Sequence, residues 1–396
     1  MIKIDSGLNS FKRQTENWNI SASDNDDQQS QLSLAGQFAG SNLSNLEGFN
    51  SFNPYLPEST TQGLLECIHE VQTMSCSMSG LNAASLVSLS SSQAIFGCLS
   101  MINKYHMIKK QARNTLLLCT DLPQVIDVAA HTNLQLKKIS LVQLEQNLDS
   151  TVAAIIVDVP NLAADEFVSK SVLKLIREMD IIIYMEGSGQ YFYSHHSMPK
   201  NVTFDLLNLD LSYQCETDSG VYAILSNDKL KSYLPTPRVQ QKENSFSLQT
   251  QQQNPFSIGP LNTGAGNIKK ILRCYVQLRL KGTHGIQQQA MKAIVAAKYF
   301  IKKLADSGYS DACFTIGTSG VCFITVNQPV ESKLSLEQGL ECYKLLGLSA
   351  DDVLPENKTH FTITLGRLHC LSKTQLDDLI ELFLNLENAV EHEKDA

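Results

Sequence analysis

Five short, nearly continuous apolar runs constrain what this 396-residue chain can fold into. They lie at 115–119, 153–157, 181–185, 206–209 and 221–225. Apolar runs of this length are typical of strands that are buried on both faces of a sheet. Helical patterns lie between several of them, most clearly at 170–179, and such alternation predicts a mostly parallel α/β sheet.

The remaining elements divide the chain into segments of different character. Apolar residues recur at helical spacing over 61–78, 92–107, 267–280 and 286–305, and Gly80 is a natural stop for the first of these helices. Strand patterns at 320–326 and 360–365 and helical patterns at 336–345 and 374–386 predict a compact α+β domain. The predicted segments are a polar, disordered tail (1–45), a large α/β domain (46–239), a Gln-rich linker (240–265), connecting helices (266–306) and a small C-terminal domain (307–396).

Composition excludes several classes of protein. The net charge is −8 and no Lys/Arg-rich run is present, which argues against nucleic acid or an anionic membrane as partner. No apolar stretch reaches the ~20 residues that span a bilayer, and residues 1–19 lack the apolar core of a signal peptide. The ten cysteines form no CxxC pair and no zinc spacing, so we expect reduced thiols, a cytoplasmic protein and no metal site.

One group of short motifs is more specific than the fold pattern. Leu46-Glu47-Gly48-Phe49 is followed by Pro54-Tyr55-Leu56-Pro57-Glu58, the pair Gln62-Gly63 and a helix that ends at Ser79-Gly80-Leu81. Ser257-Ile258-Gly259 and Gly266-Asn267 follow further on. In this order the motifs resemble the glycine cleavage system P-protein, glycine dehydrogenase (decarboxylating). The spacing favours its catalytic half, or β-type subunit, and the resemblance covers roughly residues 46–390.

The resemblance implies a fold and a chemistry. The fold is that of fold-type I pyridoxal-phosphate (PLP) transferases, similar to aspartate aminotransferase: a large α/β domain with the cofactor and a small α+β C-terminal domain. Such a family member decarboxylates glycine on PLP and passes the aminomethyl group to lipoyl H-protein. PLP acts as the electron sink, while the protein supplies an imine lysine and a carboxylate at the pyridinium nitrogen.

The lysine is missing at the position that the resemblance assigns to it. A His-Lys pair follows the strand in the family, and this chain has Ser212-Tyr213 after the run 204–211. A phenol cannot form an imine, so no catalytic residue is assigned, and we expect Tyr213 to be a packing or hydrogen-bonding residue. The nearby Lys200, Lys229 and Lys231 lie many residues from the strand end, and a shifted alignment that recruits one of them is the alternative.

The cofactor-binding positions are also altered. The family's Asp-Gly-Ala-Asn becomes Glu186-Gly187-Ser188-Gly189, so a longer carboxylate stands at a strand end. It is either a remnant of the pyridinium partner or a solvated acid. Where the family has Gly-Ala-His this chain has Ser91-Ser92-Gln93, which removes the aromatic ring that stacks on the cofactor. Hydroxyls at a helix N-terminus can still hold a phosphate, so Ser90, Ser91, Ser92 and Gln93 are candidate cofactor contacts, although serine N-capping is the favoured interpretation.

Further positions that carry chemistry in the family are replaced here. A second histidine is Gln124, and a basic Arg-x-Arg is Pro260-Leu261-Asn262. The glycine-rich stretch after the lysine is reduced to Asp218-Ser219-Gly220, and the upstream Gly-Ser-Cys-Thr-Met-Lys segment has no counterpart in 30–44. Scaffold motifs therefore match while chemical positions do not.

Three hypotheses follow. The first is a non-catalytic P-protein homologue, a structural or regulatory subunit that forms a homodimer or pairs with an active P-protein chain, with lipoyl H-protein as a further candidate partner. The second is a PLP-dependent glycine decarboxylase with altered or weak chemistry, in which PLP binds non-covalently. The third is an interaction protein that has lost the cofactor. The missing lysine favours the first.

Overall fold

The computed structural model describes residues 56–120, 122–158, 169–187, 204–211, 221–306 and shorter segments between 314 and 381. The helices are α3 (Glu58–Ser79), α4 (Ser91–Ile108), α5 (Pro123–Ala129), α7 (Lys170–Glu178) and α10 (Ile268–Asp306), with the 3-10 helices η1 (Leu141–Gln143), η2 (Glu145–Asn147) and η3 (Lys231–Tyr233). The strands are β1 (Ala83–Ser88), β2 (Thr115–Leu118), β3 (Gln135–Lys138), β4 (Val152–Asp158), β5 (Ile182–Gly187), β6 (Leu206–Asp210), β7 (Tyr222–Ser226), β8 (Arg238–Lys242), β9 (Ser245–Gln249), β10 (Phe314–Gly317), β11 (Val321–Asn327), β12 (Val353–Asn357) and β13 (His360–Thr364).

Seven strands form the main sheet, in the order β1-β7-β6-β5-β4-β2-β3. The neighbours from β3 to β6 pair in parallel, and β7 is antiparallel to both β6 and β1. The predicted mostly parallel sheet is confirmed, and each of the five apolar runs overlaps one of its strands.

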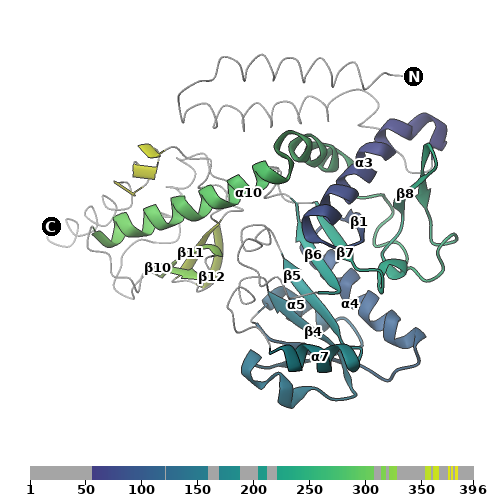
Figure 1. Ribbon diagram of the computed structural model, residues 1–396, viewed down its shortest axis with the longest axis horizontal. Coiled ribbons are helices and arrows are strands. Elements are labelled where there is room, and N and C mark those ends of the chain that lie inside the picture. Colours follow the sequence, from purple (N-terminus) through teal and green to yellow (C-terminus); the bar gives the residue numbers. More distant parts are fainter. Residues whose placement is uncertain are drawn as a thin grey trace.

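Helices cover both faces of this sheet (Figure 1). On one face, apolar residues of α3, α7 and α10 pack against Ile183, Met185 and Leu207. On the other face, α4 and α5 pack against Ile182, Tyr184 and other residues of the same strands. The alternation along β5 therefore assigns residues 182–185 in turn to two separate cores, which explains why the sequence is hydrophobic up to Glu186.

The backbone just before α10 passes close to β1 at Gly266, a residue of the motif Gly266-Asn267. Gly266 has a φ of 92°, which favours glycine, and a Cβ there would lie 2.3 Å from the carbonyl oxygen of Leu86. The backbone of the chain therefore passes β1 at a distance that no other residue permits.

The predicted linker at 240–265 is wrong for its first part. Residues 238–249 form the hairpin β8–β9, with Val239 and Leu248 as a buried cross-strand pair. The glutamines that suggested a linker lie on its accessible positions. Side chains of α3 fix the hairpin instead: Gln62 bonds the N–H and carbonyl of Phe246, and Gln72 bonds those of Val239.

The second half of the chain begins with α10. The two predicted helices at 267–280 and 286–305 both lie within α10, and a kink at the non-helical Gly282 (φ 60°, ψ −177°) separates them. Beyond it lies a four-stranded antiparallel sheet in the order β10-β11-β13-β12, which contains the strands expected at 320–326 and 360–365. The predicted tail (1–45), the helix at 336–345 and most of the helix at 374–386 lie outside the described residues.

Candidate functional site

The candidate site lies at the carboxyl edge of the main sheet. β1, β5 and β6 point in the same direction, so Ser88, Glu186 and Asp210 stand near the ends of three strands at one edge. Ligands of open α/β sheets bind at this edge. Glu186 and Asn208 are register partners on neighbouring strands, and both are buried.

Glu186 is held by hydrogen bonds from the protein. The hydroxyl of Tyr184 donates to its Oε2, and the side-chain amide of Asn208 donates to its Oε1 at 2.8 Å. Glu186 is 4% exposed, which rules out a solvated acid at the strand end. Tyr184 precedes Glu186 by two residues on β5, and Asn208 lies on the neighbouring strand β6. The carboxylate therefore has one hydrogen-bond donor on its own strand and one on the next strand.

Cys98 of α4 completes this buried cluster. Burial raises the pKa of the Tyr184 hydroxyl well above its usual value, and the neighbouring Cys98 and Glu186 raise it further. Burial likewise raises the pKa of the Cys98 thiol, with Glu186 as a second cause. Tyr184 and Cys98 are therefore protonated hydrogen-bonding groups at neutral pH. Sequence analysis predicted Glu186 but missed Tyr184, Asn208 and Cys98, although the period of two along β5 places Tyr184 on the same face as Glu186.

The N-terminus of α4 is capped from within the chain. The N-cap is Ser90, whose hydroxyl accepts a hydrogen bond from the N–H of Gln93. The side chain of Gln93 accepts from the N–H of Leu89 at 2.7 Å and donates to the carbonyl of Leu261 at 2.9 Å. Ser90 therefore caps the N-terminus of α4, which agrees with the interpretation favoured for these serines.

Ser91 contacts a residue of α5 beside this helix end. Its hydroxyl donates to Oε1 of Gln124 at 2.9 Å. Gln124 and Leu261, the partner of Gln93, are thus neighbours of the N-terminus of α4. Ser92 is exposed. The structure therefore brings Ser90, Ser91, Gln93, Gln124 and Leu261 together at one helix end.

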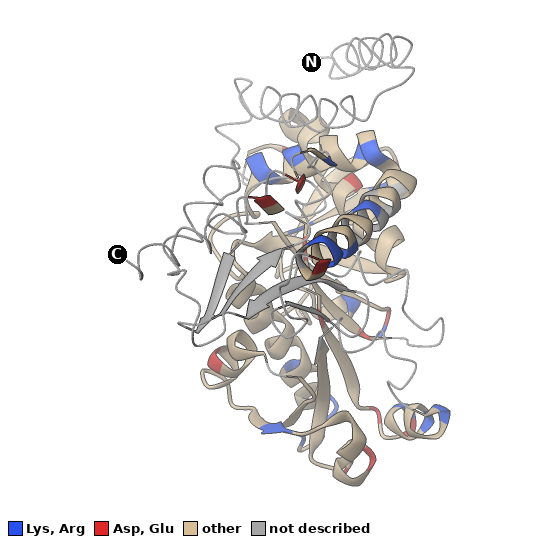
Figure 2. Cartoon of the chain, turned by 90° about the vertical axis from the view of Figure 1, so that its left-hand side faces the viewer, with Lys and Arg blue, Asp and Glu red and all other residues tan. Residues whose placement is uncertain are grey.

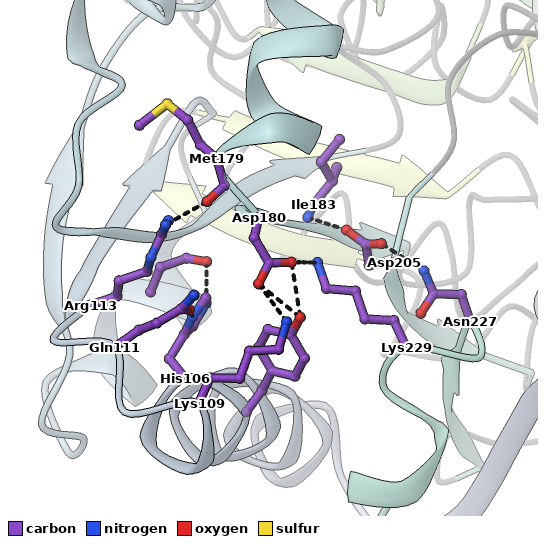
Figure 3. Close-up of polar contacts among 12 residues, drawn as sticks. His106, Lys109, Gln111, Arg113, Met179, Asp180, Ile183, Asp205, Asn227 and Lys229 are labelled. Carbon is purple, nitrogen blue, oxygen red and sulfur yellow. Dashed lines mark hydrogen bonds and ion pairs between the residues drawn. The ribbon is translucent and has the colours of Figure 1, made fainter.

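The lysines nearest in sequence to the expected imine position do not lie at the carboxyl edge in the part of the chain that the structure describes. Tyr213, Lys200, Ser188 and Gly189 belong to segments that the structure does not describe. Lys229 follows β7 at the opposite, amino edge of the sheet, where it pairs with Asp180 at 2.7 Å (Figure 3). Lys231 pairs with the exposed Asp228 at 2.8 Å. Lys229 and Lys231 thus form ion pairs away from the carboxyl edge of the sheet, where the resemblance predicts the imine lysine.

The described residues contain neither a cluster of metal ligands nor a membrane-spanning helix. In that part of the chain no three His, Cys, Asp or Glu side chains are grouped as metal ligands. None of its helices combines the length and apolarity needed to cross a bilayer.

Sequence comparison identifies relatives of one kind. The sequence model of the family described as Glycine cleavage system P-protein matches residues 39–187. A probable glycine dehydrogenase (decarboxylating) subunit 2 from Coxiella burnetii (strain CbuK_Q154) is 27% identical over 288 residues, which is 69% of this chain and 59% of that protein. The protein of the same description from Methylococcus capsulatus is 27% identical over 286 residues, with 68% and 59% covered. The chain spans about 59% of the length of these curated relatives.

Solved structures agree on the fold. A glycine decarboxylase (P-protein) of the glycine cleavage system, in inhibitor-bound form, matches with a TM-score of 0.66 at 15% identity, over 88% of this chain and 82% of that one. The Lactobacillus brevis glutamate decarboxylase matches at 0.59 and 11% identity, over 90% and 85%. A Toxoplasma gondii ornithine aminotransferase, described with partial occupancy of PLP at its active site, matches at 0.55 and 15% identity, over 83% and 77%. The predicted fold-type I architecture is confirmed, and the sequence similarity is to the glycine cleavage system P-protein family.

Proposed function

We propose that this chain is a P-protein homologue that does not perform the parent reaction and that acts as a structural or regulatory subunit. The observation that carries the proposal is Tyr213 at the position of the imine lysine. Between residues 204 and 225 the sequence has no lysine at all. Without an imine lysine the protein loses transimination and the rate advantage of a covalently held cofactor.

The geometry of the candidate site supports the proposal. The two oxygens of Glu186 accept hydrogen bonds from Tyr184 and Asn208, so the protein holds the carboxylate in place without a cofactor. The polar groups of Gln93 and Ser91 at the helix end are likewise bonded within the chain. None of these residues is a lysine, so they do not fit PLP held through an imine. We therefore assign no chemical step to them.

The partner is a second component of the proposal. The relatives are named as subunit 2 of glycine dehydrogenase (decarboxylating). A subunit of this kind implies a partner subunit, and we propose that this chain pairs with a P-protein chain, or with a second copy of itself. Lipoyl H-protein is a further candidate partner, to be tested in the same way.

One observation favours the alternative, a PLP-dependent glycine decarboxylase with weak or altered chemistry. A carboxylate, Glu186, remains at the strand end where the family has its pyridinium partner, and Ser90 to Ser92 remain at the N-terminus of α4. PLP would then bind non-covalently. Glycine-carboxyl exchange that is detectable and is lost in Glu186→Ala would favour this alternative, provided that the variant retains its melting temperature.

The test of the main proposal is an absorbance spectrum of the purified chain with excess PLP, before and after borohydride reduction, followed by peptide mass mapping. We expect the spectrum of free PLP and no stoichiometric pyridoxyl-lysine adduct. A visible aldimine band together with a single adducted lysine would overturn the proposal. Coexpression with a P-protein chain tests the partner independently, and the absence of both a heteromer and self-association would contradict the subunit role.

A further inference from the structure

The charge of α10 is opposite to that of the chain as a whole. The protein is acidic, with 32 Lys and Arg against 40 Asp and Glu. Nine of those 32 basic residues lie within the 39 residues of α10, where Asp306 is the single acidic residue. Figure 2 shows Lys and Arg repeatedly along this helix. Lys and Arg residues are thus enriched in α10. They are spread along the helix and do not form a compact Lys/Arg run in the sequence.

Part of this charge forms an exposed stripe on the second half of α10. Its members are spaced three or four residues apart and are Lys292, Val295, Lys298 and Lys302. All are exposed, and Val295 is 63% exposed. The neighbouring side of the helix carries the buried Ala296 and Phe300. Residues with this spacing share one side of a helix, so the three ammonium groups surround one apolar side chain.

The stripe lacks compensation within the described part of the chain. None of its lysines forms an ion pair with a carboxylate there. An ion pair of α10 among the described residues joins Arg279 to Glu70 of α3 at 3.6 Å, in the first half of the helix. The described residues therefore leave the positive charge of the stripe uncompensated.

We propose that the stripe Lys292, Val295, Lys298 and Lys302 is a docking surface for an acidic face of a partner protein. Charge complementarity selects the partner: three ammonium groups fit carboxylates, and Val295 offers the apolar contact that protein interfaces have at their centre. Duplex DNA would be repelled by the net charge of −8, and four side chains supply few phosphate contacts. A membrane-bound helix would need a much wider apolar face. The inference does not depend on the loss of catalysis.

The experiment measures binding of a labelled peptide that alternates Glu with Leu to the full-length chain, by fluorescence anisotropy. We expect saturable binding that weakens with salt, and at least about tenfold weaker binding when Lys292→Glu, Lys298→Glu and Lys302→Glu are combined. The matched control reverses the same number of exposed lysines elsewhere, Lys137, Lys170 and Lys174, and should bind as the wild type does. Circular dichroism of both variants verifies that they are folded.

Other results would overturn the proposal. Equal loss of binding in the two triple variants would mean non-specific attraction, and tighter binding of a duplex DNA or of phosphatidylserine vesicles would assign the stripe to another class of partner. Salt-sensitive self-association, lost only in the α10 variant, would identify a second copy of this chain as the occupant. The peptide with Gln in place of Glu must bind more weakly, because the charge carries the inference.

Discussion

At the scale of single residues, the hydroxyl of Tyr184 is a hydrogen-bond donor to a buried carboxylate. It is fully buried and donates to Glu186, which is 4% exposed. Tyr184→Phe leaves the shape of the site almost unchanged but removes this donor from a buried carboxylate. An unsatisfied buried acceptor costs about 1–3 kcal/mol. We therefore expect Tyr184→Phe to lower the free energy of unfolding by about that amount in urea titrations.

The matched control is Tyr233→Phe. Tyr233 is half-buried and packs edge-on against Tyr105, and its hydroxyl has no hydrogen-bond partner among the described residues. Its loss should change stability by less than about 0.5 kcal/mol. If the effect of Tyr184→Phe disappeared when PLP was added, the hydroxyl would belong to a cofactor site and the assignment of Glu186 as a structural group would be wrong.

A second polar cluster lies at the amino edge of the sheet and gives a prediction about pH (Figure 3). Asp180 accepts hydrogen bonds from Lys109 at 2.8 Å, Lys229 at 2.7 Å and the hydroxyl of Tyr105. Burial raises the pKa of Asp180, but the two lysines and the tyrosine outweigh it and hold this pKa well below the usual range. The carboxylate thereby joins the end of α4, the turn before β5 and the turn after β7.

The sign of the pH effect follows from this depressed pKa. The stabilisation is complete above the unfolded pKa of about 3.9 and is lost as the pH falls below it toward the folded value. Asp180→Asn should lower the unfolding free energy by about 1–3 kcal/mol at pH 7, and the difference from wild type should shrink below about pH 4. Asparagine tolerates the φ of 57° at this position. Asp228→Asn, at an exposed ion pair with Lys231, should have a much smaller effect in the same titration.

At the scale of elements, two glutamines of α3 form hydrogen bonds with the backbone of the hairpin β8–β9, as a neighbouring strand would. Gln72 is buried and bonds the carbonyls of Ala84 and Val239 and the N–H of Val239. Gln72→Met keeps the side-chain length but removes all three hydrogen bonds, so we expect a loss of about 2–4 kcal/mol in urea unfolding. Gln62→Met removes the similar pairing with Phe246, where water can take over, and should cost about 1 kcal/mol or less. Equal effects of the two changes would contradict burial as the cause.

The same elements show what could be predicted from sequence. Strands buried on both faces, such as β4 and β5, were predicted because two cores require apolar residues at every position. β3 has mostly exposed residues, and β8 and β9 are polar, so their sequences carry no such signal. Glu186 was predicted because the family resemblance places a carboxylate there, after an apolar run that predicts a strand. Asn208 and Cys98 were missed because register and helix packing, which sequence does not reveal, bring them to it.

At the scale of the whole molecule, free cysteines lie on both sides of the main sheet. Cys67 of α3 and Cys274 of α10 are buried in one core, and Cys98 of α4 is buried in the other. Burial raises the pKa of Cys67 to about 12, which leaves very little reactive thiolate at neutral pH. These thiols can react with an alkylating reagent only when the surrounding core opens.

Both cores share the strands of one sheet, so we expect them to open together. Alkylation in increasing urea, followed by peptide mass mapping, should give the same midpoint for Cys67, Cys98 and Cys274, equal to the midpoint of circular dichroism. Cys76, which is only half-buried and has a pKa raised to about 11 by burial, is the internal control and should react at lower urea. Earlier labelling of Cys274 alone would mean that α10 separates from the sheet before it unfolds. In that case the helix that carries the basic stripe would be an independent unit, and partner binding through the stripe would leave the stability of the sheet unchanged.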